Sequence, residues 1–111
     1  MANEFIPSDI PLTQRTVGHI LRARAEQFAD KPFIETTSGE SISYRSMHER
    51  SNRFAHGLER FGVEFQEPVL VMMPDVIDFL TVWCGLGKRG AIEVPINVAY
   101  RKSILTRLCN D

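Results

Sequence analysis

The amino-acid sequence predicts an α/β fold in which a β-hairpin and a parallel βαβ unit are flanked by helices. Two apolar runs, at residues 68–73 and 91–96, are separated by a helical pattern that begins after Pro74-Asp75 and ends in glycines. Apolar runs without alternation are typical of strands in a parallel sheet, and a crossover helix commonly joins two of them. Short β-rich runs around Ser38-Gly39 predict the hairpin.

The composition indicates one globular domain without a nucleic-acid or membrane partner. The chain has 111 residues, of which 43% are hydrophobic and 24% charged, and its net charge is -1 at pH 7. These proportions are ordinary for a chain that buries a core. Charges of both signs are spread along the sequence, so no basic footprint for nucleic acid or anionic lipid is present. The longest apolar run, residues 79–87, is too short for a membrane span.

The sequence predicts a cytoplasmic protein. Its N-terminus does not have the basic and apolar pattern of a secretion signal. Cys84 and Cys109 have neither the spacing of metal ligands nor an extracellular context that would favour a disulfide. A reducing compartment is therefore the expected location.

Residues 1–15 are predicted to form an N-terminal arm, because prolines interrupt a stretch without periodicity. The first helix is expected to follow, with Thr16 as its N-cap. Apolar side chains then recur at helical spacing, at Val17, Ile20, Leu21, Ala25 and Phe28. Residues 30–32 should end the helix, since the residue before a proline is disfavoured in the α region.

The hairpin is expected over residues 32–43, and a second helix over about 44–61. Apolar and small side chains fall on one face of that helix, namely Tyr44, Met47, Ser51, Phe54, Ala55, Leu58 and Phe61. Gly62 suits the position after the helix, where a positive φ costs glycine little.

The βαβ unit is expected to be mostly buried. The lack of alternation in residues 68–73 predicts a strand that is covered on both faces. Asp75 should cap the next helix, whose apolar residues occupy most of its circumference and predict burial on several sides. Ligands of such sheets gather at the carboxyl ends of the strands, here Pro74-Asp75 and residues 97–100. A further helix follows, with Ile104, Leu105 and Leu108.

Two sequence patterns resemble phosphate-binding motifs but occur in the wrong context. Residues 85–90 read G-x-G-x-x-G, a motif that binds pyrophosphate when it follows a strand and opens a helix. Here the glycines end a helix and precede the strand at 91–96, so we interpret them as a helix end and turn. Residues 36–40 are rich in Thr, Ser and Gly, but no lysine follows them and their flanks predict a hairpin turn.

The histidines and cysteines form no catalytic or metal-binding pattern. His19, His48 and His56 lack the spacing of metal ligands. Cys84 lies in the most apolar helix, where a thiolate is disfavoured, and no G-x-S-x-G elbow is present. One site hypothesis remains, in which basic side chains near the second strand's carboxyl end attract a phosphate-bearing ligand; the alternative is that they form the solvated face of a helix. These side chains are Arg101, Lys102 and Arg107.

The order of these elements resembles the N-terminal region of the adenylate-forming acyl-CoA synthetase family. The matching segments are TVGHILRARAEQFADKPFIE, SYRSMHERSNRFAHGLERFGV and VLVMMPDVIDFLTVWCGLGKRGAIEVPINVAYR. The chain departs from the family at Phe65-Gln66-Glu67, where Lys-Gly-Asp is usual, and at Asp75, where Asn is usual. Both positions are turn or cap sites. The resemblance implies that residues 16–111 are the first portion of the N-terminal AMP-binding domain, which is the large α/β domain of these enzymes. That domain is incomplete in this chain.

The resemblance also implies a two-step reaction in the full-length enzyme. A carboxylate attacks the α-phosphate of Mg-ATP to give an acyl-adenylate and pyrophosphate, and coenzyme A then displaces AMP to form a thioester. The acid is not specified, with fatty acids among the candidates. The family's phosphate loop, nucleotide-binding residues and catalytic lysine lie beyond the matching part, so no catalytic, cofactor-binding or metal-binding residue is assigned here. We expect the chain alone to be inactive and to bind neither ATP, Mg²⁺ nor coenzyme A.

The partner that this hypothesis predicts is the remainder of the same polypeptide. A sheet edge left open without that partner predicts self-association of the chain. Two alternatives remain, a stand-alone non-catalytic α/β module that binds a nucleotide or a partner protein, and a redox domain that uses a dinucleotide. Titration with NAD(H) tests the redox alternative.

Overall fold

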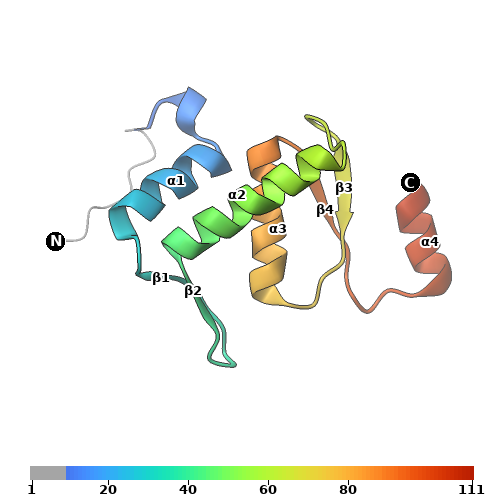
Figure 1. Ribbon diagram of the computed structural model, residues 1–111. Coiled ribbons are helices and arrows are strands. Elements are labelled where there is room, and N and C mark those ends of the chain that lie inside the picture. Colours follow the sequence, from blue (N-terminus) through green and yellow to red (C-terminus); the bar gives the residue numbers. More distant parts are fainter. Residues whose placement is uncertain (1–9) are drawn as a thin grey trace.

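The computed structural model describes residues 10–111 and shows helices around two small sheets (Figure 1). The elements are η2 (Leu12–Gln14), α1 (Val17–Phe28), β1 (Pro32–Glu35), β2 (Ser41–Ser43), α2 (Tyr44–Arg60), β3 (Pro68–Val71), α3 (Val76–Arg89), β4 (Ile92–Pro95) and α4 (Lys102–Asn110). Most of the predicted arm lies outside the described residues. The part that is described contains the 3-10 turn η2, which its lack of periodicity did not predict.

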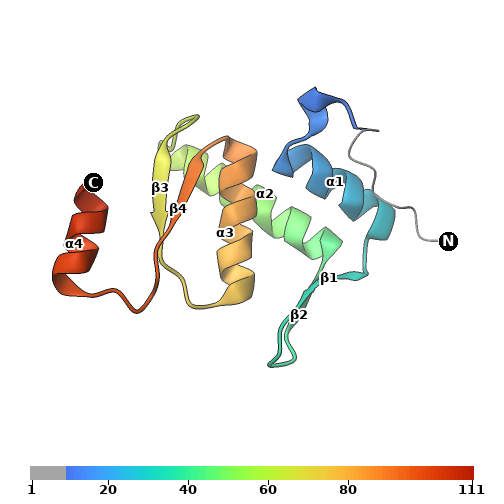
Figure 2. The same ribbon diagram turned by 180° about the vertical axis from the view of Figure 1, so that it is seen from behind.

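Helices α1, α2 and α3 pack against one another and form what we call the three-helix unit. In both views the β1–β2 hairpin hangs from one end of this unit, while β3 and β4 lie beside α3 and α4 stands apart from the rest (Figures 1 and 2). Within residues 10–111, no helix combines the length and the apolar character that crossing a bilayer requires.

The predicted helix boundaries are confirmed by the observed caps. The Thr16 hydroxyl accepts a hydrogen bond from the His19 amide at 3.2 Å, and Asp75 Oδ1 accepts one from the Asp78 amide at 2.8 Å. Each bond satisfies a backbone donor that has no partner within its own helix. Gly62 has the predicted positive φ, 84°. The sequence reasoning missed the cap of α2, where the Ser43 hydroxyl accepts from the Ser46 amide at 3.1 Å.

The hairpin pairs β1 with β2 in antiparallel fashion, as predicted. Its turn closes through the Thr36 amide, which donates to the Glu40 carbonyl oxygen at 2.8 Å, and Gly39 takes a φ of 94°. The Tyr44 ring lies between Phe28 and Phe33, with ring centroids 5.3 and 4.8 Å away. These aromatic contacts attach the hairpin to α1 and to the start of α2.

The βαβ unit is also confirmed, because β3 and β4 are parallel neighbours and α3 connects them. Pro68 is paired with Ile92, and Val71 with Pro95. A core cluster joins the inner face of this sheet to α2 and α3, with Leu58, Val71, Val82 and Leu86 at its centre. A second cluster joins α1, β2, α2 and α3, with Leu21, Ile42, Met47, Ile77 and Cys84. The core therefore lies on one side of the β3–β4 sheet.

The structure contradicts several burial predictions. The strand β3 ends at Val71 rather than at residue 73 and is covered on one face only. Its Leu70 side chain is 43% exposed and that of Ile92 on β4 is 50% exposed, because no described element covers the face opposite α3. We call Pro68, Leu70 and Ile92 the open sheet face. The helix α3 is also not buried all round, since Val76 is 52% and Trp83 44% exposed.

Phe61, predicted on the buried face of the second helix, is 91% exposed. It is the residue after the last helical position, and the chain turns there toward Gly62 with its positive φ. The Phe61 amide still donates to the Gly57 carbonyl oxygen at 3.0 Å, so the helical geometry reaches this residue. Its side chain is exposed because neither core cluster reaches Phe61 at this end of α2.

Candidate functional site

The densest polar cluster joins the end of α3 to the middle of α2 through Lys88. The Lys88 ammonium donates hydrogen bonds to the His48 carbonyl oxygen at 3.0 Å and to Asn52 Oδ1 at 2.7 Å, and its Nζ lies 3.0 Å from His48 Nδ1. These are three acceptors for the three protons of an ammonium group. His48 and Asn52 are four residues apart, so they lie on the same face of α2.

The Lys88 ammonium is the charged form present at neutral pH. Burial lowers the pKa of Lys88 to about 8, which leaves the amine mostly protonated at pH 7. Burial and the nearby positive charges of Lys88 and Arg22 lower the pKa of His48. The His48 ring is therefore neutral at pH 7. Nδ1 of the ring faces the Lys88 ammonium, and Nε2 lies 3.4 Å from Nδ2 of Asn52, which is also a donor. A neutral ring accepts at only one of these two nitrogens.

A hollow of about 550 Å³ opens beside this cluster, between α1, α2 and the end of α3. Its polar and charged walls are Thr16, His19, Arg22, His48, Asn52, Lys88 and Arg89, and the remaining walls are Gly18, Phe65, Gly87 and Gly90. No carboxylate is among these residues. The Arg89 guanidinium is fixed by a 2.8 Å hydrogen bond from Nε to the Val63 carbonyl oxygen. The walls combine positively charged side chains with glycines that leave the backbone accessible, and this combination suits an anion.

The glycines of the G-x-G-x-x-G sequence serve helix packing. A Cβ at Gly85 would lie 2.6 Å from Phe54 Cδ1, and one at Gly87 would lie 3.0 Å from Val17 Cβ. Gly90 ends α3 in the left-handed conformation at φ 74°. The motif thus lies at the end of a helix and before β4, as predicted, and it lets α3 approach α1 and α2 closely. Residues 36–40 form the hairpin turn, also as predicted.

The other sequence candidates are dispersed. His19 and His56 are exposed and do not approach one another as ligands, and no group of three or more His, Cys, Asp or Glu side chains within residues 10–111 could hold a metal ion. Burial raises the pKa of Cys84 to about 11, so this thiol is protonated at neutral pH. The prediction that Cys84 is unsuited to be a nucleophile agrees with this environment.

The three basic residues at the carboxyl end of β4 do not line the hollow at Lys88. All three are exposed, and the Arg101 guanidinium donates to the carbonyl oxygens of Val98 and Tyr100 in its own loop. That loop is a turn in which Asn97 Oδ1 accepts from the Ala99 amide at 2.9 Å. Binding of a phosphate group by Arg101, Lys102 and Arg107 stays a prediction.

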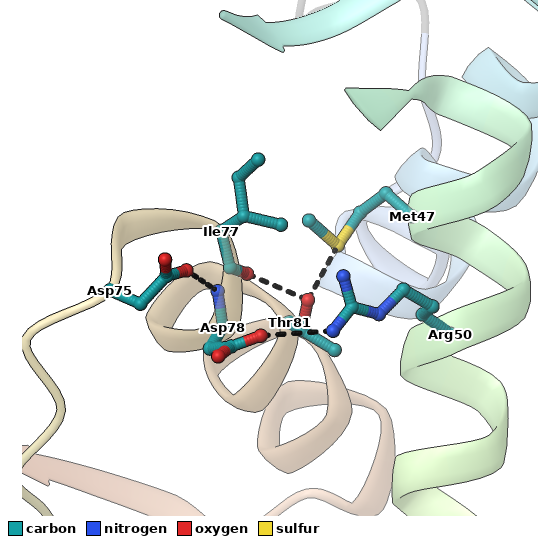
Figure 3. Close-up of polar contacts among 6 residues, drawn as sticks. All are labelled: Met47, Arg50, Asp75, Ile77, Asp78 and Thr81. Carbon is teal, nitrogen blue, oxygen red and sulfur yellow. Dashed lines mark hydrogen bonds and ion pairs between the residues drawn. The ribbon is translucent and has the colours of Figure 1, made fainter. Parts of the chain in front are cut away.

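Polar contacts between α2 and α3 were not foreseen from the sequence (Figure 3). The Arg50 guanidinium donates to Asp78 Oδ1 at 2.9 Å, one turn into α3 from the Asp75 cap. The buried Thr81 hydroxyl donates to the Ile77 carbonyl oxygen at 2.7 Å and lies 3.7 Å from the sulfur of Met47. With the Lys88 cluster, these contacts fix α3 against α2 at both ends.

One buried polar atom has no hydrogen-bond partner among the described residues. It is Oε1 of Glu93, on β4. Burial raises the pKa of this carboxyl group. A buried acceptor without a donor is destabilising.

The matching family model and the similar proteins point to the same family. The sequence model of the family described as AMP-binding enzyme matches residues 21–111. The 2,3-dihydroxybenzoate-AMP ligase of Bacillus subtilis is 32% identical over 94 residues, which are 85% of this chain and 17% of that protein. The long-chain-fatty-acid--CoA ligase FadD13 of Mycobacterium tuberculosis is 30% identical over 98 residues, which are 87% of this chain and 20% of that protein.

Solved structures show the same fold. The anthranilate CoA ligase AuaEII in complex with anthranoyl-AMP superimposes with a TM-score of 0.76 at 25% identity, covering 94% of this chain and 20% of that chain. The N-terminal domain of FACL13 from Mycobacterium tuberculosis superimposes with a TM-score of 0.76 at 26% identity, covering 84% of this chain and 24% of that chain. The predicted fold class and family resemblance are confirmed. The chain spans about a fifth of the length of the relatives it matches.

Proposed function

We propose, from the premise that this chain belongs to the AMP-binding enzyme family, that it is the first portion of a ligase that activates a carboxylic acid with ATP. In the proposed first step, a carboxylate oxygen of the substrate attacks the α-phosphorus of Mg-ATP and the bond to pyrophosphate breaks. The products are an acyl-adenylate and pyrophosphate. The carboxylate oxygen then belongs to a good leaving group, AMP.

The observation that carries this proposal is the match of the family over residues 21–111, which covers both sheets and all four α-helices in part or whole. The share of each relative that is covered supports assigning residues 16–111 to part of a larger AMP-binding domain, and the superposition on the N-terminal domain of FACL13 supports placing that part at its start. We assign the remaining groups that hold the nucleotide to other parts of that enzyme. No step of the reaction is assigned to a residue of this chain.

The proposed second step transfers the acyl group to coenzyme A. The thiol sulfur attacks the acyl carbon, AMP leaves, and a thioester forms. The names of FadD13 and of the anthranilate CoA ligase support this step, whereas the name of the Bacillus subtilis relative refers to an AMP ligase. Thioester formation is therefore the finer part of the proposal. A fatty acid is one candidate substrate, and the cytoplasm is the proposed location.

The residues described here do not suit the binding of Mg²⁺. At the carboxyl ends of the strands, the Asp75 carboxylate is used as a helix cap and Asn97 is used in a turn. No other group of acidic side chains among residues 10–111 offers a metal site. We propose that this chain contributes scaffold, and that on its own it catalyses neither step.

The exposed apolar residues of the open sheet face support this proposal. Leu70 and Ile92 expose apolar side chains, and Glu93 has a buried oxygen without a donor. We propose that the remainder of the polypeptide covers the face formed by Leu70 and Ile92, whereas Glu93, paired with Val69, belongs to the inner face. In the absence of that cover, the free edge of β4 should promote self-association. Sedimentation of the chain as a stable monomer at high concentration would contradict this point.

The direct experiment is ATP–pyrophosphate exchange by the polypeptide from the complete reading frame that contains this chain, with a panel of aromatic and fatty carboxylic acids. We expect exchange that depends on one class of acid, followed by thioester formation when coenzyme A is added. The 111-residue chain in the same assay should give none. Failure of every acid to support exchange would contradict the ligase proposal and favour a non-catalytic binding module.

A further inference from the structure

We propose that the hollow between α1, α2 and the end of α3 binds a phosphate-bearing small molecule. The hollow is distinct from the strand edge at which ligands of parallel sheets usually gather. Lys88 and Gly90 line it and directly precede β4, so it lies at the amino end of that strand. The proposal does not depend on the ligase activity proposed above.

The first argument is uncompensated charge. All three partners of the Lys88 ammonium are neutral acceptors, namely a ring nitrogen, a carbonyl oxygen and an amide oxygen. The ion pairs found between described residues lie elsewhere, at Arg45–Asp30 and Arg50–Asp78. The Arg89 guanidinium is likewise bound to a carbonyl oxygen. A hollow with this wall favours anions, because basic side chains line it and no carboxylate does.

The second argument is the position of Arg22. Its side chain lines the same hollow from α1, is exposed, and makes no hydrogen bond or ion pair to any residue in the described range. Arg22 lies close enough to His48 to lower the pKa of that ring. The carboxylates of Glu26 and Glu49 also act on His48, with the opposite sign, but neither lines the hollow. Arg22 is therefore free to donate to a ligand in the hollow, while the charge of Lys88 on the other wall attracts that ligand.

The third argument is shape. The volume, about 550 Å³, lies within the range of small-molecule sites. Gly18, Gly87 and Gly90 line the wall without side chains, so a ligand can approach the backbone there. The hollow also reaches the first turn of α1, whose positive dipole end favours negative charge. Phosphate groups match this combination of a guanidinium donor and ammonium charge.

A purely structural role for Lys88, as a link between α2 and α3, explains its three hydrogen bonds. It does not explain why the Arg22 side chain lines the same hollow. The two interpretations differ in what removal of Arg22 does. If Lys88 only joins the two helices, Arg22→Gln does not change the affinity of the chain for an anion. If the hollow is an anion site, the same substitution weakens binding while the fold persists, because the Arg22 side chain contacts no described residue through polar atoms.

The test is calorimetric titration of the whole 111-residue chain with inorganic pyrophosphate and, separately, with ADP, at neutral pH and low salt. Circular dichroism confirms that each variant is folded. We expect saturable binding that weakens as salt is added. Arg22→Gln should weaken it about tenfold, the loss of one hydrogen bond between charged groups. Tighter binding of ADP than of pyrophosphate would identify a nucleotide, and the reverse a free polyphosphate; both results support the site.

Arg53→Gln is the matched control, because Arg53 is an exposed arginine on α2 that does not line the hollow. It should change the affinity by less than about twofold. Lys88→Gln should abolish binding wherever that variant remains folded. The proposal is overturned if the folded chain binds neither probe, or if Arg22→Gln and Arg53→Gln bind equally well.

Discussion

The two faces of the β3–β4 sheet differ sharply in how far other elements cover them. The inner face packs on α2 and α3, where Leu86 is 1% exposed and Val71 4% exposed. The open sheet face shows Leu70 at 43% exposure and Ile92 at 50%. The same two strands thus supply both a finished core and an unfinished surface.

Within residues 10–111, described elements cover the inner face of the sheet and leave apolar side chains of the outer face exposed. Apolar residues on both faces of a parallel strand indicate cover on both sides. The helices α2 and α3 supply the inner cover. The proposed function assigns the outer cover to the rest of the ligase.

Leucine truncation on the two sides of the sheet should give the largest contrast. Leu86→Ala removes a fully buried side chain from the cluster of Leu58, Val71 and Val82 and should lower the free energy of unfolding by about 3 kcal/mol. Leu70→Ala, the same change on the open sheet face, should cost less than about 1 kcal/mol. Urea denaturation of the two variants measures the contrast. Equal losses would mean that the open sheet face is covered in solution.

Glycine substitutions should sharpen the description of α3 as a closely packed helix. Gly85→Ala places a Cβ 2.6 Å from the Phe54 ring and should lower the free energy of unfolding by about 1–3 kcal/mol. Gly57→Ala, in the interior of α2, meets no atom within 4 Å and should raise stability by about 0.5–1 kcal/mol through helix propensity. Thermal unfolding distinguishes the two signs. Stabilisation by Gly85→Ala would show that α3 is farther from α2 than described.

The N-cap of α3 should have a smaller effect. Asp75→Ala removes the acceptor of the Asp78 amide and should lower the free energy of unfolding by about 1 kcal/mol. Asp75→Asn keeps an acceptor at the same place and should be nearly neutral. Chemical denaturation compares the variants. A large loss in the Asn variant would mean that the carboxylate has a role beyond capping.

The smallest expected effect concerns Glu93 and depends on pH. Burial raises the pKa of Glu93 in the folded chain above its ordinary value of 4.5, so the folded state holds this proton more tightly than the unfolded state. The resulting stabilisation is present below pH 4.5 and is lost as pH rises through the folded pKa. At pH 7, Glu93→Gln should therefore raise stability, by less than about 1 kcal/mol, and the gain should vanish near pH 4.

Glu35→Gln, at an exposed position on β1, is the control for this comparison and should leave stability nearly unchanged at both pH values. A gain from Glu93→Gln that is independent of pH would show that ionisation of Glu93 is not its origin.

Local sequence signals predicted most of the fold. Thr16, Asp75 and Gly62 act through hydrogen bonds or backbone angles within a few residues, so their roles are readable from short segments. The positions of Leu58 and Leu86 follow from helical periodicity. The parallel pairing of β3 with β4 followed from two apolar runs joined by a helix, because few connections other than a crossover fit that order.

The candidate site was not predicted, for a physical reason. The Lys88 cluster depends on how α3 lies across α2, and 36 residues separate Lys88 from Asn52. The spacing of His48 and Asn52 on one helix face was the only local signal. The exposure of Leu70 could not be predicted from the sequence either. An apolar strand has the same residue pattern whether elements pack on one face of its sheet or on both. Phe61 shows that helical periodicity places a side chain on a face but does not tell where along the helix the core ends.

The central claim is that the three-helix unit is complete while the open sheet face is not. Amide hydrogen exchange of the chain under native conditions, read residue by residue by NMR, tests it most directly. We predict that amides of α2 and α3 near Met47 and Leu86 exchange only through global unfolding, and that those of β4 and α4 exchange through local opening with a much lower free energy. Equal protection of β4, α4 and the three-helix unit would contradict the account.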